Sequence, residues 1–443
     1  MSVRKQFANY FSEDNLKQIF TDHIVYSGAT GIDNLDQYAF RKQLNDQVAI
    51  LSKKILAGTY QFTKYKLKLV SKGRGKKPRE IAISTVRDRI AMRAMCEFLS
   101  ERFKSGLSLE LPQNVIKRIK TDVVSGKYSG YIKLDVSDFY PSIKHKELES
   151  RLRKRIKDPG IMNVILAAIT SPTVIVSKAS DKPSAIGVPQ GLAISNILAA
   201  VYLLNIDRHM NSYPGIAYSR YVDDVLILCD SKQAEKVAKD VISRFSRIGL
   251  RVHDPIKAPE KSSIGDVKDR FDYLGYQFSD GSVSARTETV EKLKESIAAI
   301  FTSHKHSKLK NEKFLEWRLN LRITGCVFEN KSKGWLFFFS EINDESLLHS
   351  LDNYVRKLIK RFNVGIKPKR FSRAFKELSY RRYETNYIPN FDNYSLDQKK
   401  DVLVEYFDFK LGSLTDEEIE FHFHKRIGKQ VKDLLEDIQN FGY

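Results

Sequence analysis

Apolar residues recur at helical spacing at the start of the chain and then begin to alternate with polar ones. From Ser12 to about Leu56 the spacing predicts amphipathic helices, with Ser12 as an N-cap. From Tyr60 to Val70 the period becomes two, which predicts a strand, and Arg79 to Ile83 predicts the returning strand of a basic hairpin. On the first strand, one face is apolar and carries Tyr65, Leu67 and Leu69. The other face carries Lys64, Lys66 and Lys68.

The middle of the chain predicts helices that alternate with short strands. Thr85 caps a helix through Asp88, and a glycine loop leads into a second long helix that ends near Ile206. The loop covers Gly187 to Gly191, and the strands are predicted at Tyr131 to Val136, on both sides of an Asp223-Asp224 turn, and at Phe271 to Phe278.

After about Val290 the pattern turns helical and remains so. No internal repeat is evident in the chain. We predict domain boundaries near Asp280 to Ala285 and near Tyr380 to Asn390. Helices are predicted around Thr289 to Ile300, Asn311 to Arg322, Leu347 to Phe362 and Glu417 to Phe441.

The net charge of the chain indicates the class of partner that it binds. The 443 residues fit two or three packed units, and 75 Lys and Arg against 54 Asp and Glu give a formal charge of +21 that is spread along most of the chain. An excess of this size favours a polyanionic partner, with nucleic acid as the leading candidate. The alternative is a protein kept soluble by surface lysines.

The cysteines and the N-terminal residues indicate the cellular compartment in which we expect the protein. Cys96, Cys229 and Cys326 lie far apart without CxxC spacing, which indicates neither a disulfide framework nor a zinc site. The chain starts without an apolar segment of signal-peptide length, and no stretch reaches the roughly 18 apolar residues of a membrane span. We therefore expect a reduced, cytoplasmic protein that does not enter a membrane.

Three carboxylates carry the candidate chemistry. Asp223 and Asp224 lie in a turn between apolar strands, and Asp135 lies near the end of a predicted strand upstream. Phosphoryl transfer to a chain end needs two divalent cations about 4 Å apart, and hard Mg²⁺ takes carboxylate oxygens as ligands. If the strands are neighbours, these side chains meet at one site. Alone, an Asp-Asp turn is more often simple turn chemistry.

Three ordered segments together resemble the catalytic motifs of reverse transcriptases. Leu134 to Ile143, read LDVSDFYPSI, looks like motif A, and Gly187 to Gly191, read GVPQG, looks like motif B. Tyr221 to Asp224, read YVDD, looks like motif C in the Tyr-x-Asp-Asp form typical of that family. Further resemblance, from Lys64 to Phe278, includes the fingers segment around Lys77-Pro78-Arg79 and Thr85 to Arg89, motif D at Gly249-Leu250 with Lys261, and motif E at Tyr273 to Tyr276.

The resemblance implies an α+β fold, that of a right-hand polymerase. It predicts fingers and a palm, whose antiparallel sheet is flanked by helices, followed by an all-helical thumb and C-terminal extension. The corresponding segments are 1–58 as a helical lead-in, 59–130 as fingers with part of 150–185, 131–282 as palm, 283–380 as thumb and 381–443 as extension.

The resemblance also assigns roles to single residues. Asp135, Asp223 and Asp224 are the catalytic carboxylates and would bind two Mg²⁺ ions, for which Mn²⁺ could substitute, with the Val136 carbonyl as an extra ligand. Tyr140 would favour dNTPs by crowding a ribose 2′-hydroxyl; a core aromatic is the alternative. The other expected nucleotide contacts are Lys77 (or Lys72), Arg79, Gln190, Gly191 and Lys261 (or Lys257), and the expected nucleic-acid contacts are Lys64, Lys66, Lys68, Arg87, Leu274, Gly275 and Tyr276.

Several readings of the biological role stay open. The implied partners are dNTPs, an RNA template and a DNA or RNA primer, with a co-encoded noncoding RNA as a candidate template. A compact enzyme with a helical extension resembles the bacterial abortive-infection and phage-defence groups. Retron-type or intron-type reverse transcriptases are the alternatives; no Asn-Ala-x-x-His element occurs, and Ile323-Thr324-Gly325 only approximates the retron Val-Thr-Gly. From other classes come an RNA-dependent RNA polymerase, against which Tyr140 and Tyr221 argue, and a noncatalytic RNA-binding protein.

Overall fold

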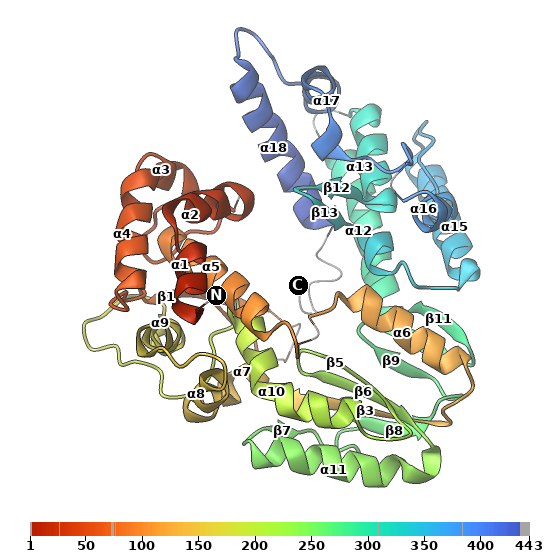
Figure 1. Ribbon diagram of the computed structural model, residues 1–443. Coiled ribbons are helices and arrows are strands. Elements are labelled where there is room, and N and C mark those ends of the chain that lie inside the picture. The colour runs from red at the N-terminus through yellow and green to blue at the C-terminus, as the bar shows by residue number, and fades with distance from the viewer. Residues whose placement is uncertain are drawn as a thin grey trace. The chain divides into compact units, whose positions relative to one another are not determined.

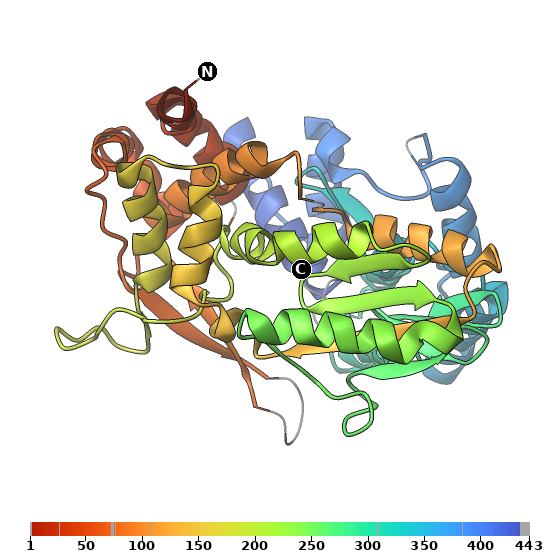
Figure 2. The ribbon, with the colours of Figure 1, turned by 60° about the horizontal axis from the view of Figure 1, so that its bottom comes forward.

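The computed structural model describes residues 2–434 except 26, 72–74, 76, 108, 308, 309 and 383. The chain divides into two compact units, each shown in the ribbons of Figures 1 and 2. Unit 1 consists of Met1–Glu110 and Ile132–Ile264, and unit 2 of Leu111–Tyr131 and Gly265–Tyr443. This division is coarser than the five segments predicted from the sequence, which remain predictions.

Unit 1 begins with the predicted helical lead-in. Its elements are α1 (Val3–Tyr10), α2 (Glu13–Ile19), the π-helix η1 (Phe20–Ile24), α3 (Gln37–Arg41) and α4 (Leu44–Leu56). The Ser12 hydroxyl accepts a hydrogen bond from the Asn15 N–H, which confirms the predicted N-cap of α2.

The basic hairpin forms as predicted, within a three-stranded sheet of order β2-β1-β4. β1 (Tyr65–Val70) pairs antiparallel with β2 (Arg79–Ile83) and parallel with β4 (Thr173–Val174). Tyr65 is buried but Leu69 is 57% exposed, so the predicted apolar face is wrong at the far end of the strand, where the core of unit 1 no longer covers it.

Helix α5 (Val86–Phe103) anchors this hairpin to the core. The Thr85 hydroxyl accepts from the Asp88 N–H, as the cap prediction requires. The Asp88 carboxylate does not complete a capping box, because it is fully buried and accepts from the Tyr60 hydroxyl at 2.6 Å and the Thr63 N–H at 3.0 Å. Burial raises the pKa of Asp88.

The palm sheet has the strand order β5-β6-β3-β7. Figure 1 shows helices α10 and α11 running along this sheet. β3 (Gly130–Ser137) therefore lies next to the strand that follows the Asp223-Asp224 turn, which confirms the predicted neighbourhood. The other elements are β5 (Ala217–Tyr221), β6 (Asp224–Cys229), β7 (Arg251–Val252), β8 (Ser263–Asp266), α7 (Phe139–Ser142), α8 (His145–Arg153), α9 (Pro159–Thr170), α10 (Ser195–Asn211), η2 (Ser231–Gln233) and α11 (Ala234–Arg247).

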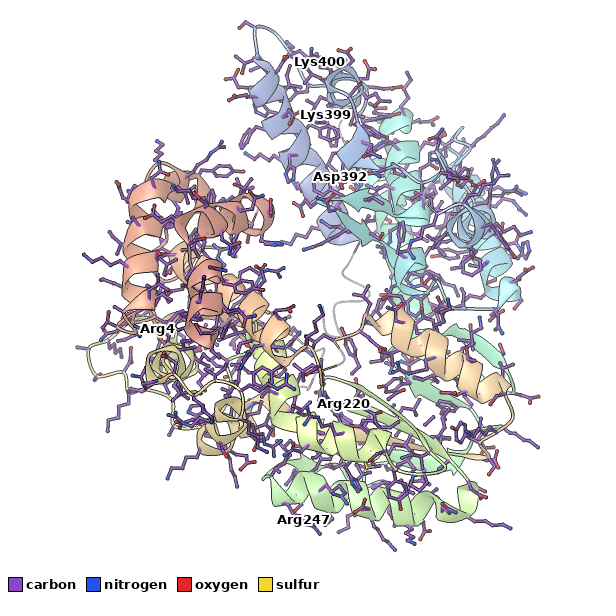
Figure 3. All side chains as sticks on the ribbon, in the orientation of Figure 1. Arg4, Arg220, Arg247, Asp392, Lys399 and Lys400 are labelled. Atoms are coloured by element: carbon purple, nitrogen blue, oxygen red, sulfur yellow. The ribbon has the colours of Figure 1, made fainter. Side chains whose placement is uncertain are left out.

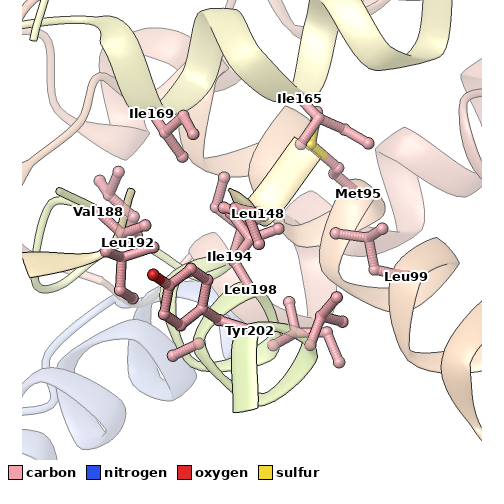
Figure 4. Packing of buried hydrophobic residues seen from close by; sticks show 14 of the residues in the cluster. Met95, Leu99, Leu148, Ile165, Ile169, Val188, Leu192, Ile194, Leu198 and Tyr202 are labelled. Carbon is pink, nitrogen blue, oxygen red and sulfur yellow. The ribbon is translucent and has the colours of Figure 1, made fainter. Parts of the chain in front are cut away.

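One continuous apolar core fixes these elements. Figure 4 shows Met95 of α5, Leu148 of α8, Ile165 of α9 and Leu198 of α10 packed together with Val188 of the glycine loop. All five side chains are at most 3% exposed. The loop that resembles motif B is therefore held by the same core as the surrounding helices.

Unit 2 contains a meander of three antiparallel strands, together with helices. The predicted single strand from Phe271 to Phe278 is instead β9 (Phe271–Tyr273) and β10 (Tyr276–Ser279), joined by a two-residue turn and followed by β11 (Ser282–Ala285). Leu274 and Gly275 both have positive φ, at 47° and 80°, which reverses the chain there. Helix α6 (Pro112–Val124) also belongs to this unit.

The remaining elements of unit 2 are mainly helical, as predicted, but a short hairpin of β12 and β13 interrupts the predicted all-helical thumb. Phe328 and Cys326 of that hairpin pack with Phe391 and Leu403, so the extension shares a core with the preceding helices. Among the described residues, no helix has the length and apolar character to span a membrane. The elements are α12 (Thr287–His306), α13 (Glu312–Thr324), β12 (Cys326–Phe328), β13 (Lys331–Lys333), α14 (Trp335–Phe338), α15 (Glu345–Phe362), α16 (Phe371–Tyr380), η3 (Phe391–Asn393), α17 (Leu396–Phe407) and α18 (Asp416–Asp433).

Candidate active site

The catalytic hairpin, defined here as Tyr221 to Asp224, places two carboxylates beside a third. Tyr221 and Asp224 are the last cross-strand pair of β5 and β6, so Val222 and Asp223 form a two-residue turn. The Val136 N–H donates to the Asp223 carbonyl at 3.4 Å, which ties the turn to β3 directly after Asp135. The expected neighbourhood of the two strands is thus confirmed, with Asp135 two residues before the end of β3 and Asp223 in the turn before β6.

Asp135 is held on three sides. Its N–H donates to the Ser262 hydroxyl at 3.0 Å, and its carbonyl accepts from the His253 N–H at 3.0 Å. The Lys261 ammonium lies 2.9 Å from its carboxylate Oδ2. This hydrogen bond raises the pKa of Lys261. Of the two lysines considered from the sequence, Lys261 is therefore the one that contacts a catalytic carboxylate.

The carboxylates repel one another in a partly desolvated site. Burial first, and then the Asp135 charge, raise the pKa of Asp223, while Arg79 and Lys261 act in the opposite direction. Burial, followed by the charges of Asp223 and Asp135, raises the pKa of Asp224 to about 7. The site is thus electrostatically prepared to accept added positive charge.

The donor set fits a hard divalent cation that also binds its substrate. Within the described part of the chain, no group of three or more His, Cys, Asp or Glu side chains is spaced to hold a metal ion. Mg²⁺ is ordinarily bound by one or two carboxylates together with waters and substrate phosphates. Asp135 and Asp223 supply that number, and the Lys261 ammonium shows that a cation is accommodated against Asp135.

A pocket of about 600 Å³ lies between the fingers hairpin and the glycine loop of unit 1. Arg79 lines it, and the Arg79 charge also lowers the pKa values of Asp223 and Tyr140, which places that guanidinium near the catalytic hairpin. The pocket therefore combines basic and amide groups suited to a nucleotide. Its lining includes Lys77, Arg79, Asp138, Val188, Pro189 and Gln190.

The glycine loop is joined to the fingers by its backbone. The Gln190 carbonyl accepts from the Ala82 N–H of β2 at 2.7 Å. Gly191 has φ of 97°, and a Cβ there would lie 2.7 Å from Ile81 Cγ2 and 3.0 Å from the Ala82 carbonyl. The resemblance placed Gly191 among the nucleotide contacts, and the structure shows in addition that a side chain at this position would clash with β2.

Tyr140 is half-buried, and its surroundings include both the core and the catalytic hairpin, which correspond to its two predicted roles. Its ring lies 5.3 Å from that of Phe139 at the edge of the core, and its hydroxyl donates to Asn196 Oδ1. Burial first, and then the Asp223 charge, raise the pKa of Tyr140. The ring is therefore fixed in position close to the catalytic hairpin.

The predicted nucleic-acid contacts of the fingers are not all exposed. Lys64 bonds to Asp181 at 3.1 Å, and Lys66 donates to Asn34 Oδ1 at 3.3 Å, whereas Lys68 is exposed. Arg87 is half-buried, with its guanidinium 5.9 Å from the Tyr60 ring and Nη1 3.4 Å from Gln47 Oε1. Lys77 is 85% exposed, and Lys72 lies outside the described residues.

The predicted motif E residues form a buried turn. Leu274, Gly275 and Tyr276 are all buried within unit 2, and the Tyr276 hydroxyl donates to the Phe338 carbonyl. The Gly275 carbonyl accepts from the Arg286 N–H at 2.9 Å. These contacts give the turn a structural role in this unit, and neither the Leu274 nor the Tyr276 side chain is exposed for nucleic acid.

Sequence reasoning missed polar residues that support the site. Ser262 and Asp207 carried no signal, because a single hydroxyl or carboxylate in a helix or loop is common. Arg220 directly precedes the YVDD segment, and this adjacency could have drawn attention to it. Their contacts link the catalytic strands to neighbouring elements.

The chain matches one family model and is similar to two bacterial proteins and to a solved telomerase structure. The family model described as "Reverse transcriptase (RNA-dependent DNA polymerase)" matches residues 70–278. The chain is 23% identical over 295 residues to Protein YkfC of Escherichia coli strain K12, covering 56% of this chain and 75% of that protein. It is 29% identical over 119 residues to the Retron Ec73 reverse transcriptase of Escherichia coli, covering 26% of this chain and 37% of that protein. Among solved structures, apo telomerase from Candida tropicalis is similar with a TM-score of 0.43 and 14% identity, covering 82% of this chain and 68% of that one.

Proposed function

We propose that this chain, which belongs to the bacterial reverse transcriptases and carries their RNA-directed DNA polymerase domain, adds dNTPs to a 3′-hydroxyl by two-metal phosphoryl transfer. The observation that carries the mechanism is the meeting of Asp135 and Asp223 on neighbouring palm strands, beside a basic pocket. A bound pair of divalent cations, Mg²⁺ with Mn²⁺ as substitute, would activate the attacking hydroxyl and stabilise the leaving pyrophosphate.

The protein's own groups then have defined tasks. Asp135 and Asp223, with Asp224 and the Val136 carbonyl, would hold the cations. Arg79 and Lys77 line the pocket and would donate to the triphosphate, Arg79 through two parallel hydrogen bonds. Lys261, already protonated against Asp135, is placed to give a proton to the leaving pyrophosphate. The Gln190 and Gly191 backbone, fixed to β2, would support the nucleotide base.

Tyr140 would select deoxynucleotides. Its hydroxyl is held by Asn196, and its ring packs at the core edge near Asp223, so it has little freedom to yield to a ribose 2′-hydroxyl. We expect Tyr140→Ala to use rNTPs at least tenfold better relative to dNTPs. Unchanged discrimination would assign Tyr140 to the core alone.

The template and biological role form the finer part of the proposal. An RNA template with a DNA or RNA primer suits the domain's class, and the charge of +21 suits phosphate contacts. We favour a cytoplasmic enzyme of bacterial phage defence with a co-encoded noncoding RNA, because a compact polymerase here carries a helical extension. A retron-type enzyme is the second candidate, and the match to the Retron Ec73 reverse transcriptase favours it.

The central test is the double variant Asp223→Asn with Asp224→Asn. Because the amides cannot hold divalent cations as carboxylates do, incorporation of dNTPs on a primed RNA template should fall at least 1000-fold. Binding of the same RNA should remain within twofold of the wild type and should weaken steeply as salt rises. Normal incorporation by this variant would refute the assignment, and a flat salt response would refute phosphate contacts as the main source of RNA affinity.

The role is tested by sequencing the nucleic acid that copurifies with the protein from its native host. A single noncoding RNA, bound also by the Asp223→Asn, Asp224→Asn variant, supports a dedicated template. Complementary DNA that appears only with the active enzyme would define the copied region. DNA that remains covalently joined to the RNA would favour the retron-type reading, and a random RNA population would contradict both.

A further inference from the structure

A partly buried ion pair connects helix α10 to the catalytic hairpin. Arg220 of β5 donates from Nε to Asp207 Oδ1 at 2.7 Å and from Nη2 to Asp207 Oδ2, so the two side chains pair through two parallel hydrogen bonds. The Tyr218 hydroxyl donates to the same Oδ1 at 2.8 Å. The Arg220 side chain is 9% exposed and that of Asp207 17%. Figure 3 labels Arg220, which lies at the palm sheet beside α10.

The third donor of Arg220 reaches the turn itself. Nη1 donates to the Val222 carbonyl at 2.7 Å. That carbonyl belongs to the peptide bond that joins Val222 to Asp223, so the guanidinium fixes the peptide plane directly before the catalytic carboxylate. Arg220, once paired with Asp207, cannot rotate to release it without breaking both interactions.

Val222 is the residue that needs such support. It has φ of 55°, in the left-handed region, although its side chain is branched at Cβ. Steric crowding makes that conformation unfavourable for branched residues, and it persists only where surrounding contacts impose it. The hydrogen bond from Arg220 to the Val222 carbonyl opposes relaxation of this backbone, in addition to the longer bond from the Val136 N–H to the Asp223 carbonyl.

We propose that Asp207 and Arg220 are positioning residues that hold Val222 in its left-handed conformation and thereby set the Asp223 carboxylate for divalent-cation binding. This inference rests on the proposed two-metal function. Neither residue lines the nucleotide pocket, and both would act through the Val222–Asp223 peptide. Because Asp207 lies on the helix that follows the glycine loop, a displacement of that helix would also reach the metal site through this pair.

The test compares Arg220→Lys and Asp207→Asn with a matched control, Arg244→Lys. Lysine keeps the charge of Arg220 but cannot bond two carboxylate oxygens and a carbonyl at once. Arg244 pairs with Asp240 through Nε at 2.9 Å on α11 and reaches no catalytic residue. Two quantities are measured on the full chain: the Mg²⁺ concentration that half-saturates primer extension, and direct Mn²⁺ binding followed by electron paramagnetic resonance.

We expect both Arg220→Lys and Asp207→Asn to raise the half-saturating Mg²⁺ concentration at least fivefold and to weaken Mn²⁺ binding by a similar factor, with Arg244→Lys unchanged. A lowered melting temperature with unchanged metal dependence would overturn the proposal, because the pair would then serve stability alone. Mn²⁺ binding needs no catalysis, so an inactive wild-type protein that still shows these binding differences would count against the polymerase mechanism and not against the positioning role.

A second substitution tests the route of action. Asparagine tolerates the left-handed conformation much better than valine. In a Val222→Asn background, Arg220→Lys should therefore change metal dependence less than twofold. An undiminished effect in that background would show that Arg220 does not act through Val222 and would overturn this part of the inference.

Discussion

Two hairpins of the same length serve different purposes in the two units. The catalytic hairpin of unit 1 turns through Val222 and Asp223, and a hairpin of unit 2 turns through Asp280 and Gly281, between the paired residues Ser279 and Ser282. Asp280 and Gly281 have φ of 42° and 75°, and an Asp-Gly pair suits such a turn. Val222, at φ of 55°, does not suit its own turn.

The two turns also differ in what holds them. The Gly281 carbonyl accepts from the neutral side-chain amide of Asn343 at 3.1 Å, whereas the Val222 carbonyl accepts from the charged and paired Arg220. In unit 2 the local sequence alone favours the turn, so a weak neutral contact suffices. In unit 1 the conformation depends on Arg220, which Asp207 of another element holds in place, and such imposed strain is typical of functional sites.

The largest effect should come from replacing the strained turn of the catalytic hairpin by residues that favour a two-residue turn, as in the hairpin of unit 2. The double variant Val222→Asn with Asp223→Gly creates an Asn-Gly turn, which favours a two-residue hairpin. We expect the melting temperature to stay equal or rise, because strain is removed, while dNTP incorporation falls at least 1000-fold, because a metal ligand is lost. Calorimetry and primer extension measure the two effects separately.

The matched control is Asp280→Asn in unit 2. Asparagine suits the positive φ as aspartate does, and Asp280 is exposed, so stability and incorporation should both remain within error. If the Asn-Gly variant instead unfolds, the catalytic turn is not strained in the way that the Val222 backbone indicates.

The carboxylates of the catalytic hairpin should also make stability depend on pH. The pKa of Asp224 is about 7 in the fold, against about 3.9 for an ordinary aspartate, so folding takes up a proton between these values. In EDTA the melting temperature should therefore fall as pH rises from about 4 to about 7, and Asp224→Asn should reduce that fall by several degrees.

Asp280→Asn again serves as the control and should leave the pH profile unchanged. Added Mg²⁺ should stabilise the wild type more at pH 8 than at pH 5, since the cation needs ionised carboxylates. Equal pH profiles for the wild type and Asp224→Asn would show that Asp224 titrates as an ordinary exposed aspartate.

Local patterns in the sequence predicted local structure well. Ser12 and Thr85 cap the helices expected of them, and Arg79 to Ile83 returns along the first strand. The catalytic carboxylates were placed on neighbouring strands because three motifs in order left few arrangements of the chain. Each of these features depends on residues close in sequence or on a pattern with several independent parts.

Features that depend on distant partners could not be predicted. The Asp88 carboxylate bonds to Tyr60, 28 residues away, and not back to the cap at Thr85. The turn between β9 and β10 could not be predicted, because leucine is not a typical turn residue and the positive φ of Leu274 is imposed by its surroundings. The pairing of Arg220 with Asp207 requires α10 to lie beside β5, which a linear pattern does not encode.

The smallest expected effect comes from placing the strain of the catalytic hairpin in unit 2. Gly281→Val puts a β-branched residue at φ of 75°, where a new Cβ would meet no atom within 4 Å, so the cost is conformational alone. We expect a loss of about 1–2 kcal/mol in the free energy of unfolding, measured by denaturant titration. Incorporation per folded molecule should not change, because no metal ligand depends on this turn. A loss of activity at full folding would show that the Asp280-Gly281 hairpin has a catalytic role, and the contrast between a strained functional turn and a relaxed structural one would fail.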